Sequence, residues 1–138
     1  MYRREIKKYI KAVKKSLNPK CIVLYGSLAR KDYNERSDVD LIIISDDLPE
    51  HPLERLKILF DLNNTSAPIE PLGYRSKEFE MMIEKRRVTA IFAMEEGIPL
   101  FGESYFKRLK GRYQEMKERT GLVREGNVWV PRKLIEQT

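Results

Sequence analysis

Cysteine is nearly absent from this sequence, and long apolar runs are absent altogether. Among 138 residues Cys21 is the single cysteine, so no internal disulfide can form and the fold cannot depend on oxidation. Its place in an apolar run favours a small buried hydrophobe over a nucleophile. No apolar run approaches the length of a membrane span, and the basic first residues contain no apolar core of a signal peptide. We therefore expect a soluble, cytoplasmic protein.

Internal repeats and low-complexity linkers are also missing, and the length suits a single domain. Charged residues make up 35% of the chain, which is well above the usual quarter. The charges are uneven, since residues 1–20 have a net charge of +7, residues 21–102 of −5 and residues 103–138 of +4. The basic ends are able to bind nucleic acid or an acidic protein, although a solvated helix face is the simpler interpretation.

Hydrophobic periodicity predicts one domain of mixed helices and strands. Helices are expected over residues 2–17, 27–33, 52–63, 76–87, 88–97 and 103–119, and strands over residues 21–26, 38–45, 67–74 and 98–102. Ser27 and Ser76 are expected to be the N-caps of their helices. The run at 38–45 is so apolar that both faces of its strand should be covered, whereas two prolines favour an edge position for 67–74. This order predicts the α/β (α+β) class, a mixed β-sheet flanked by helices.

The same patterns set the expected limits of the domain and part of its core. Residues 1–120 form the predicted domain, and residues 121–138 form a C-terminal extended tail or hairpin that either belongs to the same domain or acts as an interaction arm. In the helix at 52–63 an apolar stripe should point inward, and its members are Leu53, Leu56, Leu59 and Phe60.

Two aspartates stand at the start of the most apolar strand. Because side chains alternate along a strand, Asp38 and Asp40 should point to the same side and Val39 to the other. Neighbouring carboxylates repel and raise each other's pKa unless a cation lies between them. Magnesium prefers carboxylate and water oxygens and is often shared with substrate phosphates. The pair therefore predicts a Mg²⁺ site beside a phosphate-binding element.

A candidate phosphate-binding element stands about ten residues earlier. Gly26 ends a strand and allows a sharp turn close to a ligand, and Ser27 begins a helix whose free amides favour an anion. Arg30, one turn on, is able to reach the same phosphate. Glu70, among apolar residues of the predicted strand 67–74, is the candidate third carboxylate, with a rim salt bridge as the alternative. Three carboxylates would hold two metal ions and accept the proton of an attacking hydroxyl.

The stretch YGSLARKDYNERSDVDLIII resembles the signature of the DNA polymerase β nucleotidyltransferase superfamily, which is Gly-Ser, about ten residues, then Asp-x-Asp. It is most similar to the minimal nucleotidyltransferases of bacteria and archaea, whose usual form is Gly-Ser-x-Ala-Arg-Gly, a polar loop and Ser-Asp-x-Asp-Leu. The matching residues are Gly26, Ser27, Ala29, Arg30, Ser37, Asp38, Asp40 and Leu41. Lys31 stands where the family commonly has glycine. The resemblance extends over residues 1–110, and the signature is its specific part.

This resemblance implies a polymerase β-like fold that uses Mg²⁺, with two ions expected, and ATP or another nucleoside triphosphate. It implies transfer of a nucleotidyl group, commonly AMP, to a hydroxyl with release of pyrophosphate. By position, Asp38, Asp40 and Glu70 would be catalytic and would hold the metal. The nucleotide-binding residues would be Gly26, Ser27, Arg30 and Ser37. Many minimal members pair with a helical HEPN-type protein, often a toxin ribonuclease, and some act as its antitoxin by adenylylating a tyrosine.

The sequence leaves several functions open. A protein-modifying adenylyltransferase that acts on a tyrosine of a HEPN-type partner is favoured, because no separate domain for a small acceptor is visible. A non-catalytic or occluding antitoxin or regulatory module is the first alternative, and a transferase for an aminoglycoside-type small molecule is the second. Nucleic-acid end addition is compatible with the basic ends but is not favoured. A homo-oligomer is compatible with the sequence, and no membrane contact is expected.

Overall fold

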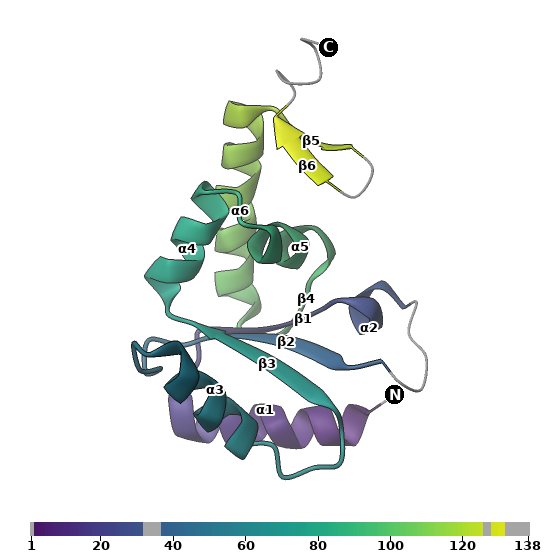
Figure 1. Cartoon of the computed structure of the whole chain (residues 1–138), viewed down its shortest axis with the longest axis vertical. Helices are drawn as coiled ribbons and strands as arrows, with labels where there is room; N and C mark the ends of the chain where they lie inside the picture. The colour runs from purple at the N-terminus through teal and green to yellow at the C-terminus, as the bar shows by residue number, and fades with distance from the viewer. Residues whose placement is uncertain (1, 32–36, 126–127, 132–138) are drawn as a thin grey trace.

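The computed structural model describes the chain outside residues 1, 32–36, 126–127 and 132–138 (Figure 1). Its elements are α1 (Arg3–Leu17), β1 (Cys21–Tyr25), α2 (Ser27–Arg30), β2 (Val39–Ile44), α3 (Pro52–Asp61), β3 (Ile69–Tyr74), α4 (Ser76–Glu84), α5 (Val88–Glu96), β4 (Ile98–Phe101), α6 (Glu103–Thr120), β5 (Leu122–Glu125) and β6 (Val128–Pro131). The predicted class, a mixed sheet flanked by helices, is confirmed. Within the described ranges no helix is both long and apolar enough to cross a bilayer.

The main sheet has four strands in the order β3-β2-β1-β4. β2 and β3 run parallel, whereas β1 pairs antiparallel with both β2 and β4, so the sheet is mixed. β3 lies at an edge, as its prolines predict. The register places Asp40 beside Tyr25 on β1 and beside Glu70 on β3. Two acidic positions about thirty residues apart in the sequence therefore lie at one level of the sheet.

Helices cover both faces of the sheet, with α1 and α3 on one side and α4, α5 and α6 on the other (Figure 1). Ile42 belongs to a buried cluster with Phe79 of α4 and further residues of α5 and α6. Its neighbour Leu41 belongs to a second cluster, with Tyr9 of α1 and Leu59 of α3. The hydroxyl of Tyr9 donates a hydrogen bond to the carbonyl oxygen of Leu59 at 2.8 Å and ties these two helices together. The expected coverage of β2 on both faces is confirmed.

Two element boundaries in the signature segment differ from the prediction. α2 ends at Arg30, because Lys31 adopts the left-handed conformation, with φ at 65°, that commonly ends helices. Residues 32–33 of the helix expected over 27–33 lie outside the described residues. β2 begins at Val39, so Asp38 precedes the strand instead of opening it.

The predicted N-caps are each displaced by one residue. Gly26 and Arg75 are the N-caps of α2 and α4, so Ser27 and Ser76 are the first residues inside their helices. The hydroxyl of Ser76 instead donates to Asp46 Oδ1 at 2.9 Å, and the Ser76 amide donates to the same oxygen at 2.9 Å. A carboxylate outside α4 therefore satisfies the amide that begins it.

The inward stripe predicted for α3 is wrong at two positions. Leu59 is fully buried, but Leu53 is 70% exposed and Phe60 is 45% exposed. Arg55 takes an inward place instead and is only 6% exposed. Its guanidinium donates to the carbonyl oxygens of Pro49, just before α3, and of Gly73 on β3. These hydrogen bonds satisfy the buried guanidinium.

Beyond α6, β5 and β6 pair antiparallel as a separate two-stranded sheet (Figure 1). This pairing agrees with the hairpin alternative for the C-terminal segment, although Gly126 and Asn127 of its expected turn lie outside the described residues. The division into a domain at 1–120 and a possible interaction arm at 121–138 stays a prediction.

Candidate functional site

Gly26 turns the chain between β1 and α2. Its φ of 75° and ψ of −156° lie in a region that is open almost to glycine alone. A Cβ built on Gly26 would lie 2.3 Å from Asp40 Oδ2, a contact that real side chains do not make. The turn predicted to receive phosphate therefore lies directly against a carboxylate predicted to hold metal.

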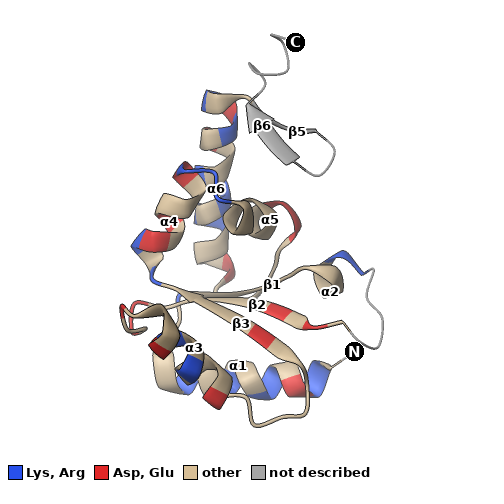
Figure 2. Ribbon diagram, viewed as in Figure 1, with Lys and Arg blue, Asp and Glu red and all other residues tan. Residues whose placement is uncertain are grey.

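All three predicted carboxylates line one pocket of about 520 Å³. Its lining residues are Tyr25, Asp38, Asp40, Leu56, Phe60, Glu70, Pro71 and Leu72. Figure 2 shows acidic segments of β2 and β3 side by side, near the basic end of α2. Asp38 and Glu70 are exposed, whereas Asp40 is partly buried. The sheet thus brings together the three acidic residues that the sequence singles out.

The carboxylates act on one another electrostatically. Partial burial raises the pKa of Asp40 above its ordinary value of 3.8, the negative charges of Asp38 and Glu70 raise it further, and Arg30 lowers it. Burial, followed by the charge of Asp40, raises the pKa of the Tyr25 phenol to about 12. The pocket therefore has a surplus of negative charge, which a bound cation would relieve.

The carboxylates do not form a closed metal site in this arrangement. In the part of the chain that the structure describes, no three His, Cys, Asp or Glu side chains lie close enough together to hold a metal ion. The donor chemistry nevertheless fits Mg²⁺, because all three candidates are carboxylates whose repulsion raises the pKa of Asp40. Asp38 and Glu70 are exposed, so they are the residues that would move to close around an ion with Asp40.

Arg30, predicted to bind the nucleotide, makes contacts within the protein. Its Nη1 lies 3.0 Å from Oε2 of Glu96, at the end of α5. Its charge also lowers the pKa of Asp40, so Arg30 is attracted from two sides. Ser37 is partly buried and directly precedes Asp38, next to residues that lie outside the described ranges. The nucleotide-binding roles of Gly26, Ser27, Arg30 and Ser37 stay predictions.

The pocket also contains residues that sequence reasoning misses. Tyr25 has a usable signal, because it directly precedes Gly26 and pairs with Asp40 once β1 and β2 are taken as antiparallel neighbours. Leu56 and Phe60 have none, since apolar residues at helical spacing ordinarily indicate core. The pocket therefore combines three carboxylates with aromatic and aliphatic side chains.

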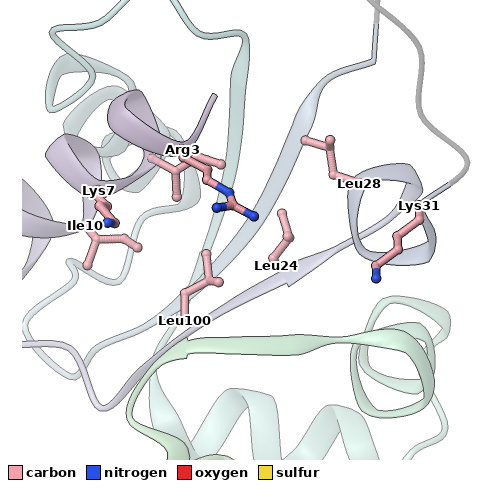
Figure 3. Close-up of a pocket in the computed structure, with 8 residues that line it drawn as sticks. Arg3, Lys7, Ile10, Leu24, Leu28, Lys31 and Leu100 are labelled. Carbon is pink, nitrogen blue, oxygen red and sulfur yellow. The ribbon is translucent and has the colours of Figure 1, made fainter. Parts of the chain in front are cut away.

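A larger pocket, of about 710 Å³, lies between α1, β1 and α2 (Figure 3). Leu24 lines it, whereas the next residue, Tyr25, lines the carboxylate pocket, because successive side chains of a strand point to opposite faces. Arg3, Lys7 and Lys31 stand around its aliphatic lining, and none of its described lining residues is acidic. This pocket is therefore separate from the candidate site.

Comparison with known proteins finds a matching family model and two relatives. Residues 5–102 match the family model described as Polymerase beta, Nucleotidyltransferase. Two proteins of Methanocaldococcus jannaschii, MJ1305 and MJ0604, both provisionally named protein adenylyltransferases, are 46% identical over 41 residues and 42% identical over 45 residues. These segments make up 30% and 31% of this chain, and 28% and 45% of the relatives. The match therefore spans less than half the length of either relative.

Solved structures share the fold at low sequence identity. A provisionally named nucleotidyltransferase from Sulfolobus solfataricus superposes with a TM-score of 0.51 at 17% identity, covering 70% of this chain and 76% of that one. A mutant form of the toxin-antitoxin MntA-HpeT gives a TM-score of 0.53 at 14% identity, covering 84% and 91%. A toxin-antitoxin with AMP-PNP gives 0.50 at 17% identity, covering 83% and 91%. At these identities the likeness concerns the fold alone.

Proposed function

Since this chain belongs to the polymerase β nucleotidyltransferase family, whose model matches residues 5–102, we propose that it transfers AMP from ATP to a hydroxyl of a partner protein. The observation that carries the proposal is the contact of Gly26 with Asp40, with Glu70 in register on the next strand. This geometry supports a phosphate-binding turn and a metal-binding carboxylate set that serve one nucleotide.

In the proposed reaction an acceptor hydroxyl attacks the α-phosphorus of ATP, a new O–P bond forms, and the bond to the bridging oxygen breaks so that pyrophosphate leaves. Asp38, Asp40 and Glu70 would hold Mg²⁺, which when bound supplies positive charge to the phosphates. Glu70, exposed on the edge strand, would accept the proton of the attacking hydroxyl or orient the group that does. The residues that would bind the nucleotide are Gly26, Ser27, Arg30 and Ser37.

A tyrosine of a helical HEPN-type protein is the acceptor that we propose. The names of the two Methanocaldococcus jannaschii relatives support a protein acceptor. The toxin-antitoxin structures of the same fold support a toxin as the partner. A phenol is also compatible with the aromatic and aliphatic side of the carboxylate pocket. The chain would then act in the cytoplasm, as an antitoxin that modifies its partner.

Label transfer tests this proposal. The purified protein is incubated with α-³²P-ATP and Mg²⁺ in a lysate of the source organism, beside Asp38→Asn and Asp40→Asn variants. The expected result is a labelled protein band that requires both aspartates. Equal labelling by wild type and variants, or no transfer to protein despite bound ATP, would contradict an adenylyltransferase with a protein acceptor.

An occluding module that binds its partner without modifying it is the second candidate. It is favoured by the ion pair with Glu96, which engages Arg30, a residue predicted to bind the nucleotide. Co-expression with the partner separates the two functions. An occluding module protects the cell equally well as the Asp40→Asn variant, whereas an adenylyltransferase loses its protection.

A further inference from the structure

Helix α3 exposes an apolar stripe next to the candidate site. Leu53 is 70% exposed and Phe60 is 45% exposed. Leu56 lies between them, at the spacing that places residues i, i+3 and i+7 on one side of a helix. Leu56 is partly buried, so two well-exposed apolar side chains flank a half-buried one on this side of α3. These three residues are called the α3 stripe below.

The α3 stripe is continuous with the carboxylate pocket. Leu56 and Phe60 line that pocket together with Asp40 and Glu70. Leu56 and Leu72 also line a smaller pocket, of about 220 Å³, between α3 and β3. A partly apolar groove therefore follows α3 and ends at the carboxylates.

The inner side of α3 is fixed, so the stripe cannot turn inward. Arg55 donates to the carbonyl oxygen of Gly73 at 3.4 Å and its Nη1 lies 2.8 Å from Oε1 of Glu78. The carbonyl oxygen of Leu59 accepts the hydrogen bond from the hydroxyl of Tyr9. Rotation of α3 would break these contacts and leave a buried guanidinium without acceptors. The stripe is thus a lasting feature of the surface rather than a core face that is loosely packed.

The exposed charges near the stripe are mainly negative. Glu54 and Asp61 are exposed on α3, and Lys57 is the exposed basic residue among the described residues of that helix. Asp38 and Glu70, which line the carboxylate pocket, add two exposed carboxylates next to the stripe. Charge complementarity therefore favours a partner that places basic side chains beside apolar ones.

We propose that the α3 stripe is the surface on which the acceptor protein docks, so that a segment with apolar residues and basic flanks presents the acceptor hydroxyl to the carboxylates. This inference rests on the proposed function and extends it to the choice of acceptor. A polyhydroxylated small molecule gains nothing from covering Leu53, which lies outside the carboxylate pocket. A protein surface would cover Leu53 and Phe60 together and remove their apolar area from water.

Leu53→Lys tests the stripe, since it places a positive charge where a basic partner should dock and leaves every residue of the carboxylate pocket in place. Val88→Lys is the matched control, because Val88 is 66% exposed and lies on α5. Wild type and both variants are compared for three quantities: the initial rate of label transfer from α-³²P-ATP to protein in the lysate, the Mg²⁺-ATP affinity by calorimetry, and the melting temperature.

The expected result is a labelling rate at least about tenfold lower for Leu53→Lys, with Val88→Lys within about twofold of wild type. Mg²⁺-ATP affinity and melting temperature should be equal in all three proteins. Labelling of the same protein band at the wild-type rate by Leu53→Lys would overturn the docking surface and leave the proposed function standing. An equal loss in both variants would overturn it too. If the wild type transfers AMP only to small molecules or RNA, or transfers none, the proposed function fails, and the docking surface proposed for a protein acceptor fails together with it.

Discussion

The α-carbon of Gly26 lies against the carboxylate of Asp40, so that even a methyl group on Gly26 would lie 2.3 Å from Asp40 Oδ2. The contact joins the turn after β1 to the first residues of β2. Glycine is needed here for two reasons. The turn has a positive φ, and the Asp40 carboxylate leaves no space for a side chain at this position.

Gly26→Ala should therefore affect both stability and ligand binding. The strained backbone alone is expected to lower the free energy of unfolding by about 1–3 kcal/mol, and the added methyl group should displace the Asp40 carboxylate. Urea unfolding measures the first effect, and calorimetric titration with Mg²⁺-ATP measures the second.

Gly111→Ala is the control for this substitution. Gly111 lies within α6, and a Cβ added there would meet nothing within 4 Å. Alanine should raise the free energy of unfolding by about 0.5–1 kcal/mol at this position, because it favours the helix. If Gly26→Ala were as stable as wild type and bound Mg²⁺-ATP equally well, the close contact of Gly26 with Asp40 would be refuted.

Asp40→Asn is expected to stabilise the metal-free protein while removing Mg²⁺-ATP binding. The pKa of Asp40 is raised in the folded state, so its charged form is disfavoured there, and folding stability falls as pH rises from 3.8 through the raised value. Asparagine removes this loss. At neutral pH in EDTA we expect a gain of up to about 1 kcal/mol, as is usual for partly exposed charges. The gain should vanish at a pH below 3.8, where the aspartate is protonated in both the folded and the unfolded state. Thermal melts of both proteins at neutral pH and at this acidic pH measure it.

Asp46→Asn should behave in the opposite way. The Ser76 amide donates to the Asp46 carboxylate and holds its pKa below the ordinary value of 3.8. This carboxylate therefore contributes stability above that value, which is lost as pH falls through the lowered pKa. Its asparagine variant should melt lower than wild type at neutral pH. An Asp46→Asn melting temperature equal to or above that of wild type at neutral pH would contradict this role of Asp46, and a lower one for Asp40→Asn would contradict the account of the carboxylate pocket.

The order of elements could be read from the sequence because it depends on local patterns. The apolar run of β2 and the prolines of β3 correctly indicate a covered strand and an edge strand. The orientation of α3 could not, because Leu53, Leu56, Leu59 and Phe60 span only about 120° of the helix and so form an ordinary inward stripe, yet of these four only Leu59 is fully buried. Arg55 decides it, since carbonyl groups on both sides of α3 accept from its guanidinium. No local pattern reveals those carbonyls.

The sequence predicts the acidic residues of the pocket but not its apolar ones. Asp38, Asp40 and Glu70 stand out in the sequence because each is a charge beside an apolar strand. Their meeting depends on the parallel pairing of β2 with β3, which sets Asp40 level with Glu70. Phe60 enters the same pocket only through the tertiary placement of α3. Charged residues beside apolar strands can thus be identified from the sequence, whereas residues that reach the pocket only through the packing of a helix cannot.

Glu96 holds Arg30 at 3.0 Å, and a bound nucleotide has to compete for the same guanidinium. Glu96→Gln is therefore expected to raise the affinity for Mg²⁺-ATP about two- to fivefold, in line with the strength of partly exposed ion pairs, and Arg30→Gln should lower it. Glu84→Gln is the control, because it removes a different ion pair, that of Arg119 with Glu84 at 2.6 Å. Calorimetric titration of all three variants decides the role of the contact. A loss of affinity in Glu96→Gln would mean that Glu96 positions Arg30 for the nucleotide instead of withholding it.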